Sequence, residues 1–123
     1  MGLKGKMRKR TQKSLKLEAD KLWSKIIRSH GYCERCGSTH YLQAAHIYSR
    51  RFNATRHDLN NGLCFCASCH RWGHDKPLDF AKWVNEYLGG AIVEELSQKA
   101  HKITKNHDFE PVVIYLREIE GKL

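Results

Sequence analysis

Residues 66–74 read Cys-Ala-Ser-Cys-His-Arg-Trp-Gly-His and place two kinds of metal ligand in direct succession. Cys66 and Cys69 are separated by two residues, a spacing that lets both sulfurs turn onto one ion. His70 follows the second cysteine at once, and His74 comes four residues later. A zinc ion held only by protein takes four donors. The stretch therefore predicts either surplus donors or two metal sites with different tasks.

A second Cys-x-x-Cys pair lies upstream and is followed by Gly37, which relieves the tight turn around such a pair. The four thiolates of the two pairs form a closed tetrahedral zinc site with no position left for a substrate, so its predicted role is structural. The candidate ligands are Cys33, Cys36, Cys66 and Cys69. The fifth cysteine, Cys64, is expected to pack as a small apolar residue. A ligand set with Cys64 in place of Cys66 stays open.

The cysteine count and the hydropathy pattern indicate the cellular compartment in which the protein is expected. Five cysteines are an odd number, and the two Cys-x-x-Cys pairs indicate thiolate ligands in a reducing, intracellular environment rather than a disulfide framework. No apolar stretch approaches the roughly 20 residues that a membrane span requires. The basic N-terminus lacks the apolar run of a secretory signal. We expect an intracellular protein without a membrane partner.

Positive charge is concentrated at the beginning of the chain. The 123 residues carry a formal charge of +9, and residues 1–30 hold ten Lys or Arg side chains against only Glu18 and Asp20. Such an excess predicts a polyanionic partner, with nucleic acid first. Residues 1–10 are expected to be a disordered basic arm. The other interpretation is a tail that only improves solubility.

Hydrophobic periodicity predicts helices on both sides of the cysteine-rich region. The expected helices cover residues 11–29, 78–88 and 92–103, and another helix begins near Ala67. Strands are expected within 41–49 and 60–66. Residues 111–120 fit either a strand or a helix, and the helix is favoured.

The two histidines after Cys69 are four residues apart. On a helix, this spacing projects both imidazoles from one face, where they can bind one transition-metal ion and leave coordination positions open. A solvated helix face can carry the same pair by accident. Spacing alone leaves both interpretations open.

The order of these motifs resembles the HNH endonucleases of the ββα-metal superfamily. The matching residues, between Tyr32 and His74, are Cys33, Cys36, Gly37, His46, Asp58, Asn61, Cys66, Cys69, His70 and His74. The resemblance implies an α+β fold with a ββα-metal core and a four-cysteine zinc site, flanked by an N-terminal helix and C-terminal helices. Residues 11–123 would form one nuclease domain, with the metal core at 31–77 and a C-terminal helical part at 78–120.

The resemblance also implies a role for each polar residue of the core. His46 would be the general base that takes a proton from the water attacking a DNA phosphodiester, since imidazole titrates near neutrality. Asn61 would orient the hairpin loop and His46 through hydrogen bonds. His70 and His74 would hold the catalytic divalent ion, which could be Mg²⁺, Mn²⁺, Ni²⁺ or Zn²⁺.

One position departs from the family pattern. The residue before the general base is commonly Asp, Glu or His in this family and belongs to the metal shell, but here it is Ala45. The ion could rely on fewer protein ligands, His46 could turn toward the metal, or the site could be degenerate. His46 is therefore interpreted first as the base, with the roles of metal ligand and structural histidine kept as alternatives.

Several basic residues are candidates for contacts to the DNA backbone. They are Arg50 and Arg51, which follow His46 closely, and Lys9, Arg10 and Lys13 of the basic segment. Phosphate contacts of this kind give affinity without reading sequence. The resemblance also points to a phage origin. Two rival functions remain: a zinc-finger protein that binds DNA without cutting, and an interaction protein whose residues 78–120 dock a phage or host complex.

Overall fold

A short hairpin and the helix that follows it form the centre of the molecule. The computed structural model describes residues 9–103 and 105–123. Strand β1 (Leu42–His46) pairs antiparallel with β2 (Gly62–Cys66), and helix α3 (Ala67–Asp75) begins directly after the second strand. The register places His46 opposite Gly62 and Leu42 opposite Cys66. This is the ββα arrangement that the sequence predicts, with six helices around one two-stranded sheet in the described part of the chain.

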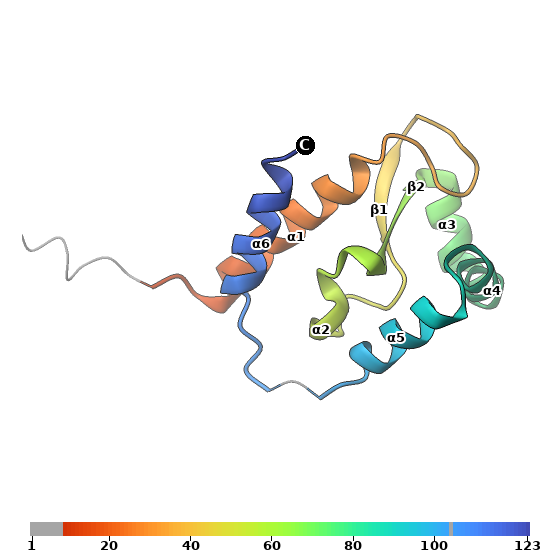
Figure 1. Cartoon of the computed structure of the whole chain (residues 1–123). Helices are drawn as coiled ribbons and strands as arrows, with labels where there is room; N and C mark the ends of the chain where they lie inside the picture. The colour runs from red at the N-terminus through yellow and green to blue at the C-terminus, as the bar shows by residue number, and fades with distance from the viewer. Residues whose placement is uncertain (1–8, 104) are drawn as a thin grey trace, which may run out of the picture.

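Helix α1 (Gln12–Arg28) agrees with the predicted helix at 11–29. Thr11 caps its first turn, because the Thr11 hydroxyl accepts a hydrogen bond from the backbone N–H of Ser14 at 3.1 Å and so satisfies one of the free donors there. Its buried residues recur every four positions and form one stripe: Leu15, Ala19, Trp23 and Ile27. The stripe packs on the sheet and on the C-terminal helix α6. Figure 1 shows α6 lying against α1.

The connection between the strands contains two short helical turns that the sequence did not predict. Helix α2 spans Asn53–Arg56, and the 3-10 helix η2 spans Leu59–Asn61. The carboxylate of Asp58 accepts a hydrogen bond from the backbone N–H of Asn60 at 2.9 Å, which caps η2. The connection therefore folds back as an ordered loop that ends at β2.

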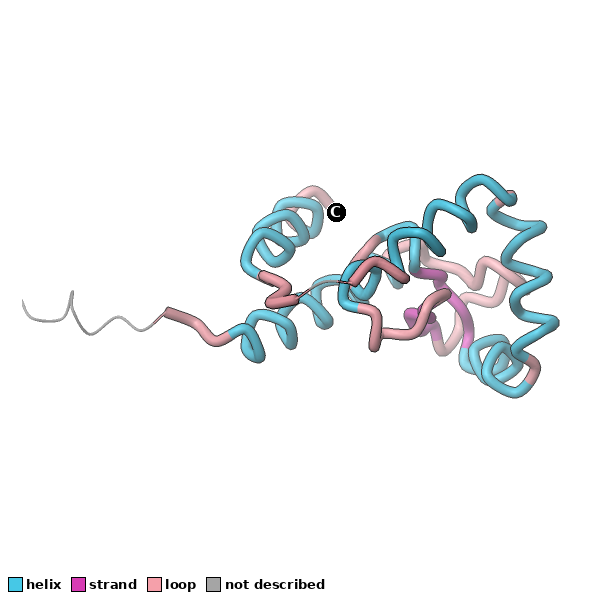
Figure 2. Tube along the Cα trace, turned by 90° about the horizontal axis from the view of Figure 1, so that it is seen from below, coloured by secondary structure: helices cyan, strands magenta, loops and turns pink. Residues whose placement is uncertain are grey.

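Three helices follow α3. Helix α4 (Pro77–Leu88) and helix α5 (Gly90–Ala100) meet at Gly89, whose φ of 92° is readily adopted only by glycine. Residues 111–120, ambiguous in the sequence, belong to helix α6 (Glu110–Glu120). Seen from below, the two strands lie among these helices, and α6 ends at the C-terminus (Figure 2).

The sheet separates two apolar clusters. On one face, Cys64 packs with the buried stripe of α1 and with Val113 and Leu116 of α6. On the other face, Ala45, Leu63 and Phe65 pack with the start of α3 and with α4. Adjacent strand residues point to opposite faces, so positions 44 and 46 of β1 face α1, whereas positions 43 and 45 face α3. Cys64 is fully buried in the first cluster, as the sequence predicts.

Candidate functional site

Four cysteines converge where the hairpin meets α3. The sulfurs of Cys33, Cys36, Cys66 and Cys69 all lie within 4.8 Å of one another, and Cys36 is the only exposed member of the four. The set contains Cys66 and not Cys64, which resolves the alternative that the spacing left open. Four sulfurs at these separations could hold one zinc ion.

The backbone around the cluster is folded for such an ion. The N–H of Cys33 donates to the carbonyl of Ser38 at 2.7 Å, and the N–H of Gly37 donates to the carbonyl of Cys33 at 2.8 Å. Gly37 takes a φ of 83°, so its expected role in the turn is seen in the structure. The N–H of Cys69 points at the sulfur of Cys66 at 3.4 Å. Both Cys-x-x-Cys turns therefore aim their sulfurs inward.

The charges of the cluster also fit a cation. Burial opposes ionisation of Cys33, but hydrogen bonds from the backbone of Cys66, Cys36 and Arg35 lower its pKa to about 6. Burial and the neighbouring sulfurs raise the pKa of Cys69 to about 12. One thiol thus ionises easily while another resists, since each further thiolate would lie against an existing one. A bound divalent ion removes that conflict, and the donor set matches the thiolate preference of zinc.

Two side chains of the first cysteine turn connect the cluster to other elements. Arg35 donates to the sulfur of Cys69 at 3.4 Å, and its guanidinium stacks 3.5 Å above the ring of Trp72 on α3. The carboxylate of Glu34 accepts hydrogen bonds from the N–H of Cys64 at 2.7 Å and from the hydroxyl of Tyr87 at 2.7 Å. The cluster is therefore clamped to α3, β2 and α4.

An open cleft of about 750 Å³ lies beside α3. Its wall contains His46 and Ala45 from β1, and His70 and His74 from α3. Arg50, from the loop after β1, completes the same wall. The structure thus brings together in one cleft three histidines that are up to 28 positions apart in the sequence.

The two helix histidines form a pair, and a strand residue orients one of them. The rings of His70 and His74 lie 4.9 Å apart between centroids. Nδ1 of His70 donates a hydrogen bond to Oε1 of Gln43 at 2.7 Å, which leaves Nε2 as the basic nitrogen. Burial and the nearby His74 lower the pKa of His70, so the ring is neutral, as a metal ligand must be. Sequence reasoning missed Gln43, although it lies two residues before Ala45 and thus on the strand face toward α3.

Ala45 stands on that same face of β1. Its side chain is only 2% exposed and packs with Leu63 and Phe65. It lines the cleft together with His70 and His74 but has no donor atom. The candidate second metal site therefore has two imidazoles and lacks the third ligand that a carboxylate at this position would give.

His46 is held on the opposite face of β1. Its Nε2 lies 3.0 Å from the carbonyl oxygen of Arg56, so this nitrogen carries the proton and Nδ1 keeps its lone pair. The ring stacks on Trp23 of α1, with centroids 4.0 Å apart and planes inclined by 12°. Burial lowers the pKa of His46 below its usual value, which keeps the ring neutral at pH 7. A neutral, oriented imidazole can accept a proton.

Asn61 is fully buried and ties together the loop between the strands. Its Oδ1 accepts from the N–H of Tyr48 at 2.8 Å, while its Nδ2 donates to the carbonyls of Tyr48 and Thr55 at 3.0 Å each. These bonds fix the chain just after His46, as expected for the hairpin loop. None of the three reaches His46 itself, so the expected direct orientation of the ring is not seen.

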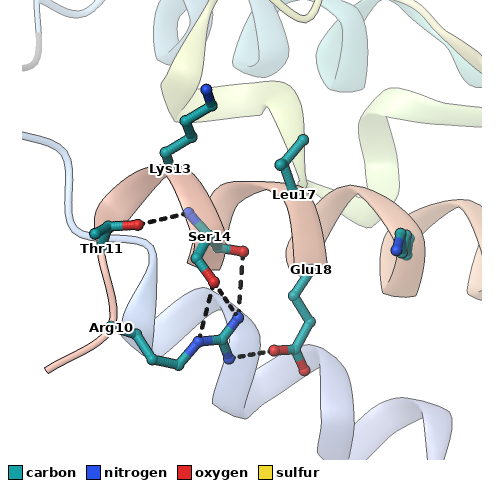
Figure 3. Close-up of a pocket in the computed structure, with 7 residues that line it drawn as sticks. Arg10, Thr11, Lys13, Ser14, Leu17 and Glu18 are labelled. Carbon is teal, nitrogen blue, oxygen red and sulfur yellow. Dashed lines mark hydrogen bonds and ion pairs between the residues drawn. The ribbon is translucent and has the colours of Figure 1, made fainter. Parts of the chain in front are cut away.

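The basic candidates fall into two groups. Arg50 lines the cleft, and Arg51 is exposed next to it with its guanidinium 4.8 Å from the ring of Phe52. Residues 1–8 of the expected arm lie outside the described residues. At the start of α1, Arg10 turns back to Ser14 and Glu18, as Figure 3 shows, and is not an unpaired phosphate ligand. Lys9, which precedes α1, and Lys13, in its first turn, are exposed and do not line the cleft.

The cysteine cluster and the cleft histidines fall within one segment that known proteins share. Residues 33–75 match the model of a family described as HNH endonuclease. This segment is an HNH domain. It covers about a third of the chain and includes the four cysteines, His46, Asn61 and the α3 histidines, so the predicted family is confirmed. No curated protein and no solved structure matches the chain.

The HNH domain indicates a nuclease-type function, and domains of this kind act on DNA. Helix α1 and helices α4, α5 and α6 lie outside the matched segment. Within the described residues, no helix has both the length and the hydrophobicity needed to cross a bilayer.

Proposed function

We propose that the chain is a metal-dependent DNA endonuclease in which residues 11–123 act as one intracellular unit. The observation that carries this proposal is the cleft, in which a neutral histidine with a fixed tautomer lies with a pair of helix histidines. Hydrolysis of a phosphodiester needs a proton acceptor and a metal ion at the same site, and the cleft contains candidates for both.

The proton path begins at His46. Its Nε2–H is bonded to the Arg56 carbonyl, so Nδ1 accepts the proton of the attacking water. The water oxygen then forms a bond to phosphorus while the bond to the 3′ oxygen breaks. The leaving oxygen takes a proton from solvent water, which gives a 5′-phosphate and a 3′-hydroxyl end. Arg50 and Arg51 hold flanking phosphates by charge, and Asn61 keeps the loop that carries them in place.

Two ions would have separate tasks. The four cysteines would hold a zinc ion that fastens the start of α3 to the hairpin. His70 and His74 would hold a second divalent ion, which would supply positive charge for the phosphate and the leaving 3′ oxygen. Gln43 fixes the tautomer of His70 in readiness for this ligand role.

Ala45 favours a second candidate function. Without a carboxylate on this face of β1, the scaffold could bind DNA through its zinc-clamped hairpin and basic residues and leave it uncut. This alternative keeps the cysteine cluster and gives the α3 histidines no catalytic task.

A plasmid-nicking assay separates the two functions. Protein that retains one zinc is supplied separately with Mg²⁺, Mn²⁺, Ni²⁺ or added Zn²⁺, next to His46→Ala and the matched control His40→Ala, an exposed histidine outside the cleft. We expect ion-dependent nicking that His46→Ala lowers by about 10²-fold or more, with unchanged DNA binding. Absence of nicking with every ion, from protein that still binds DNA, would establish the binding module.

A further inference from the structure

A tryptophan from outside the HNH segment covers His46. Trp23 belongs to α1, which ends before residue 33, and only 2% of it is exposed. One face of the His46 ring lies flat on its indole, 4.0 Å away between centroids. The indole Nε1–H donates to the carbonyl of Asp58 at 3.0 Å. The tryptophan is thus fixed at its edge and can fix the histidine at its face.

The opposite strand makes room for this contact. Gly62 pairs with His46 across the hairpin. A Cβ at Gly62 would lie 2.4 Å from Cδ1 of Ile27 and 2.7 Å from the Trp23 ring, closer than real Cβ atoms come. A glycine at this position therefore lets α1 press onto the strand pair beside His46.

A carboxylate of the same helix controls the other contact of His46. Asp20 accepts two hydrogen bonds from the Arg56 guanidinium, at 2.8 and 2.6 Å, and one from Nε2 of His57 at 2.7 Å. Arg56 also donates to the carbonyl of Arg50 at 3.0 Å. The backbone carbonyl of Arg56 in turn accepts the hydrogen bond from the Nε2–H of His46. Asp20 therefore anchors the residue that sets the tautomer of His46.

The charges around His46 come from α1 and from the loop between the strands. Asp20, Arg50, Arg56 and His57 are the titratable or charged groups that act on it. Burial works against the charge of Asp20, but hydrogen bonds from Arg56 and His57 keep its pKa below the usual value. Asp20 is therefore an anion at neutral pH that pairs with Arg56 and lies close to two histidines.

We propose that α1 is a working part of the nuclease site, in which Trp23 and Asp20 are positioning residues that hold His46 in one orientation and one tautomer. This inference rests on the proposed function, in which His46 is the base. It extends the site beyond residues 33–75, since neither residue lies in the HNH segment. Trp23 acts on the ring face, and Asp20 acts through the backbone of Arg56.

Substitutions at the two residues are expected to shift the pKa of His46 in opposite directions. In Trp23→Leu, water reaches the ring and its pKa rises toward the ordinary value, because burial is the main cause of its depression. In Asp20→Asn, the pKa falls further, since a carboxylate that favours the imidazolium is lost. Both changes are expected to lower kcat about tenfold or more with KM within about twofold, because they disturb the base and leave the arginines proposed to hold the phosphates, Arg50 and Arg51, in place.

The test is an NMR titration of the His46 ring in the zinc-bound 123-residue chain, combined with nicking kinetics. Trp23→Phe preserves a stacked ring and is expected to restore a titration close to that of the wild type. The controls on α1 are Glu18→Gln, a carboxylate paired with Arg117 of α6, and Leu15→Ala, a core truncation remote from His46.

Two results decide the proposal. Opposite shifts in Trp23→Leu and Asp20→Asn that both controls lack would support it. A His46 titration and a kcat that change no more than in the controls would make α1 a scaffold only and overturn it. If the wild type never nicks DNA, the proposed function fails, while the titration still reports whether α1 positions the ring.

Discussion

The two ends of α3 carry two metal-type ligand pairs in very different surroundings. At its beginning, Cys66 and Cys69 join two further cysteines in a tight cluster with three buried members. One turn later, His70 and His74 face a cleft of about 750 Å³, with Gln43 as the polar partner of His70. The cysteine pair belongs to a complete set of four donors, whereas the histidine pair would leave coordination positions of an ion open.

With two such ligand pairs, one short helix can serve both structure and chemistry. A closed set of four donors excludes substrate and can only hold the fold together. An open pair needs a helix that does not move, because two imidazoles alone position an ion weakly. In the proposed function, a zinc ion in the cysteine cluster immediately before His70 would supply that rigidity, so the structural site would support the catalytic one.

The most severe loss is expected from a substitution in the cysteine cluster. Cys69→Ser removes one of the four donors, and a zinc ion held by such a set would contribute on the order of 10 kcal/mol to folding, comparable with the whole stability of a domain. We expect loss of bound zinc and of the cooperative thermal transition, followed by circular dichroism and metal analysis. Cys64 is a buried cysteine outside the cluster, so the Cys64→Ala protein should still bind zinc. Its free energy of unfolding should fall by only about 1 kcal/mol. Equal behaviour of the two variants would contradict a four-cysteine site.

A change at Gln43 probes the histidine end without touching a ligand. Gln43→Leu removes the acceptor of the His70 Nδ1–H while keeping a side chain of similar size. Partners of this kind typically change metal affinity by about 10- to 100-fold, and we expect a loss near tenfold in calorimetric titration of the zinc-bound protein with Ni²⁺. Gln43→Glu, which retains the acceptor, should bind Ni²⁺ at least as tightly as the wild type. Unchanged affinity in the leucine variant would show that His70 is not a ligand.

A third change supplies the missing donor. Ala45→Asp places a carboxylate on the strand face toward His70 and His74. We expect Ni²⁺ and Mn²⁺ to bind several-fold more tightly, a gain limited by the apolar neighbours of Ala45. Ala44→Asp introduces the same group on the face toward α1 and should leave ion affinity unchanged. Similar affinities in both aspartate variants would place the ion elsewhere.

Much of the metal core could be predicted because its signals are local in sequence. The Cys-x-x-Cys spacing, the glycine after the first pair and the four-residue step between the histidines each encode a turn or a helix face. The start of α3 at Ala67 and the burial of Cys64 were predicted correctly for this reason.

The rest depends on contacts between distant segments. Trp23 fitted the apolar stripe of a helix, and periodicity could not reveal that its ring lies on His46. Asp20 counted only as one of two acidic residues in a basic segment, although it pairs with Arg56, 36 positions away. The ion pair of Arg10 with Glu18 could not be predicted either, because the net charge of a segment does not show which residues pair with one another.

Helix α3 is proposed to serve two ions with different ligands. Native mass spectrometry of the full chain, with and without added Ni²⁺, counts these ions. We expect one zinc held throughout and one Ni²⁺ gained on addition. A double variant, His70→Ala with His74→Ala, should lose only the Ni²⁺, while Cys69→Ser should lose the zinc. A wild type that never holds more than one ion, or a double histidine variant that still holds two, would contradict this claim.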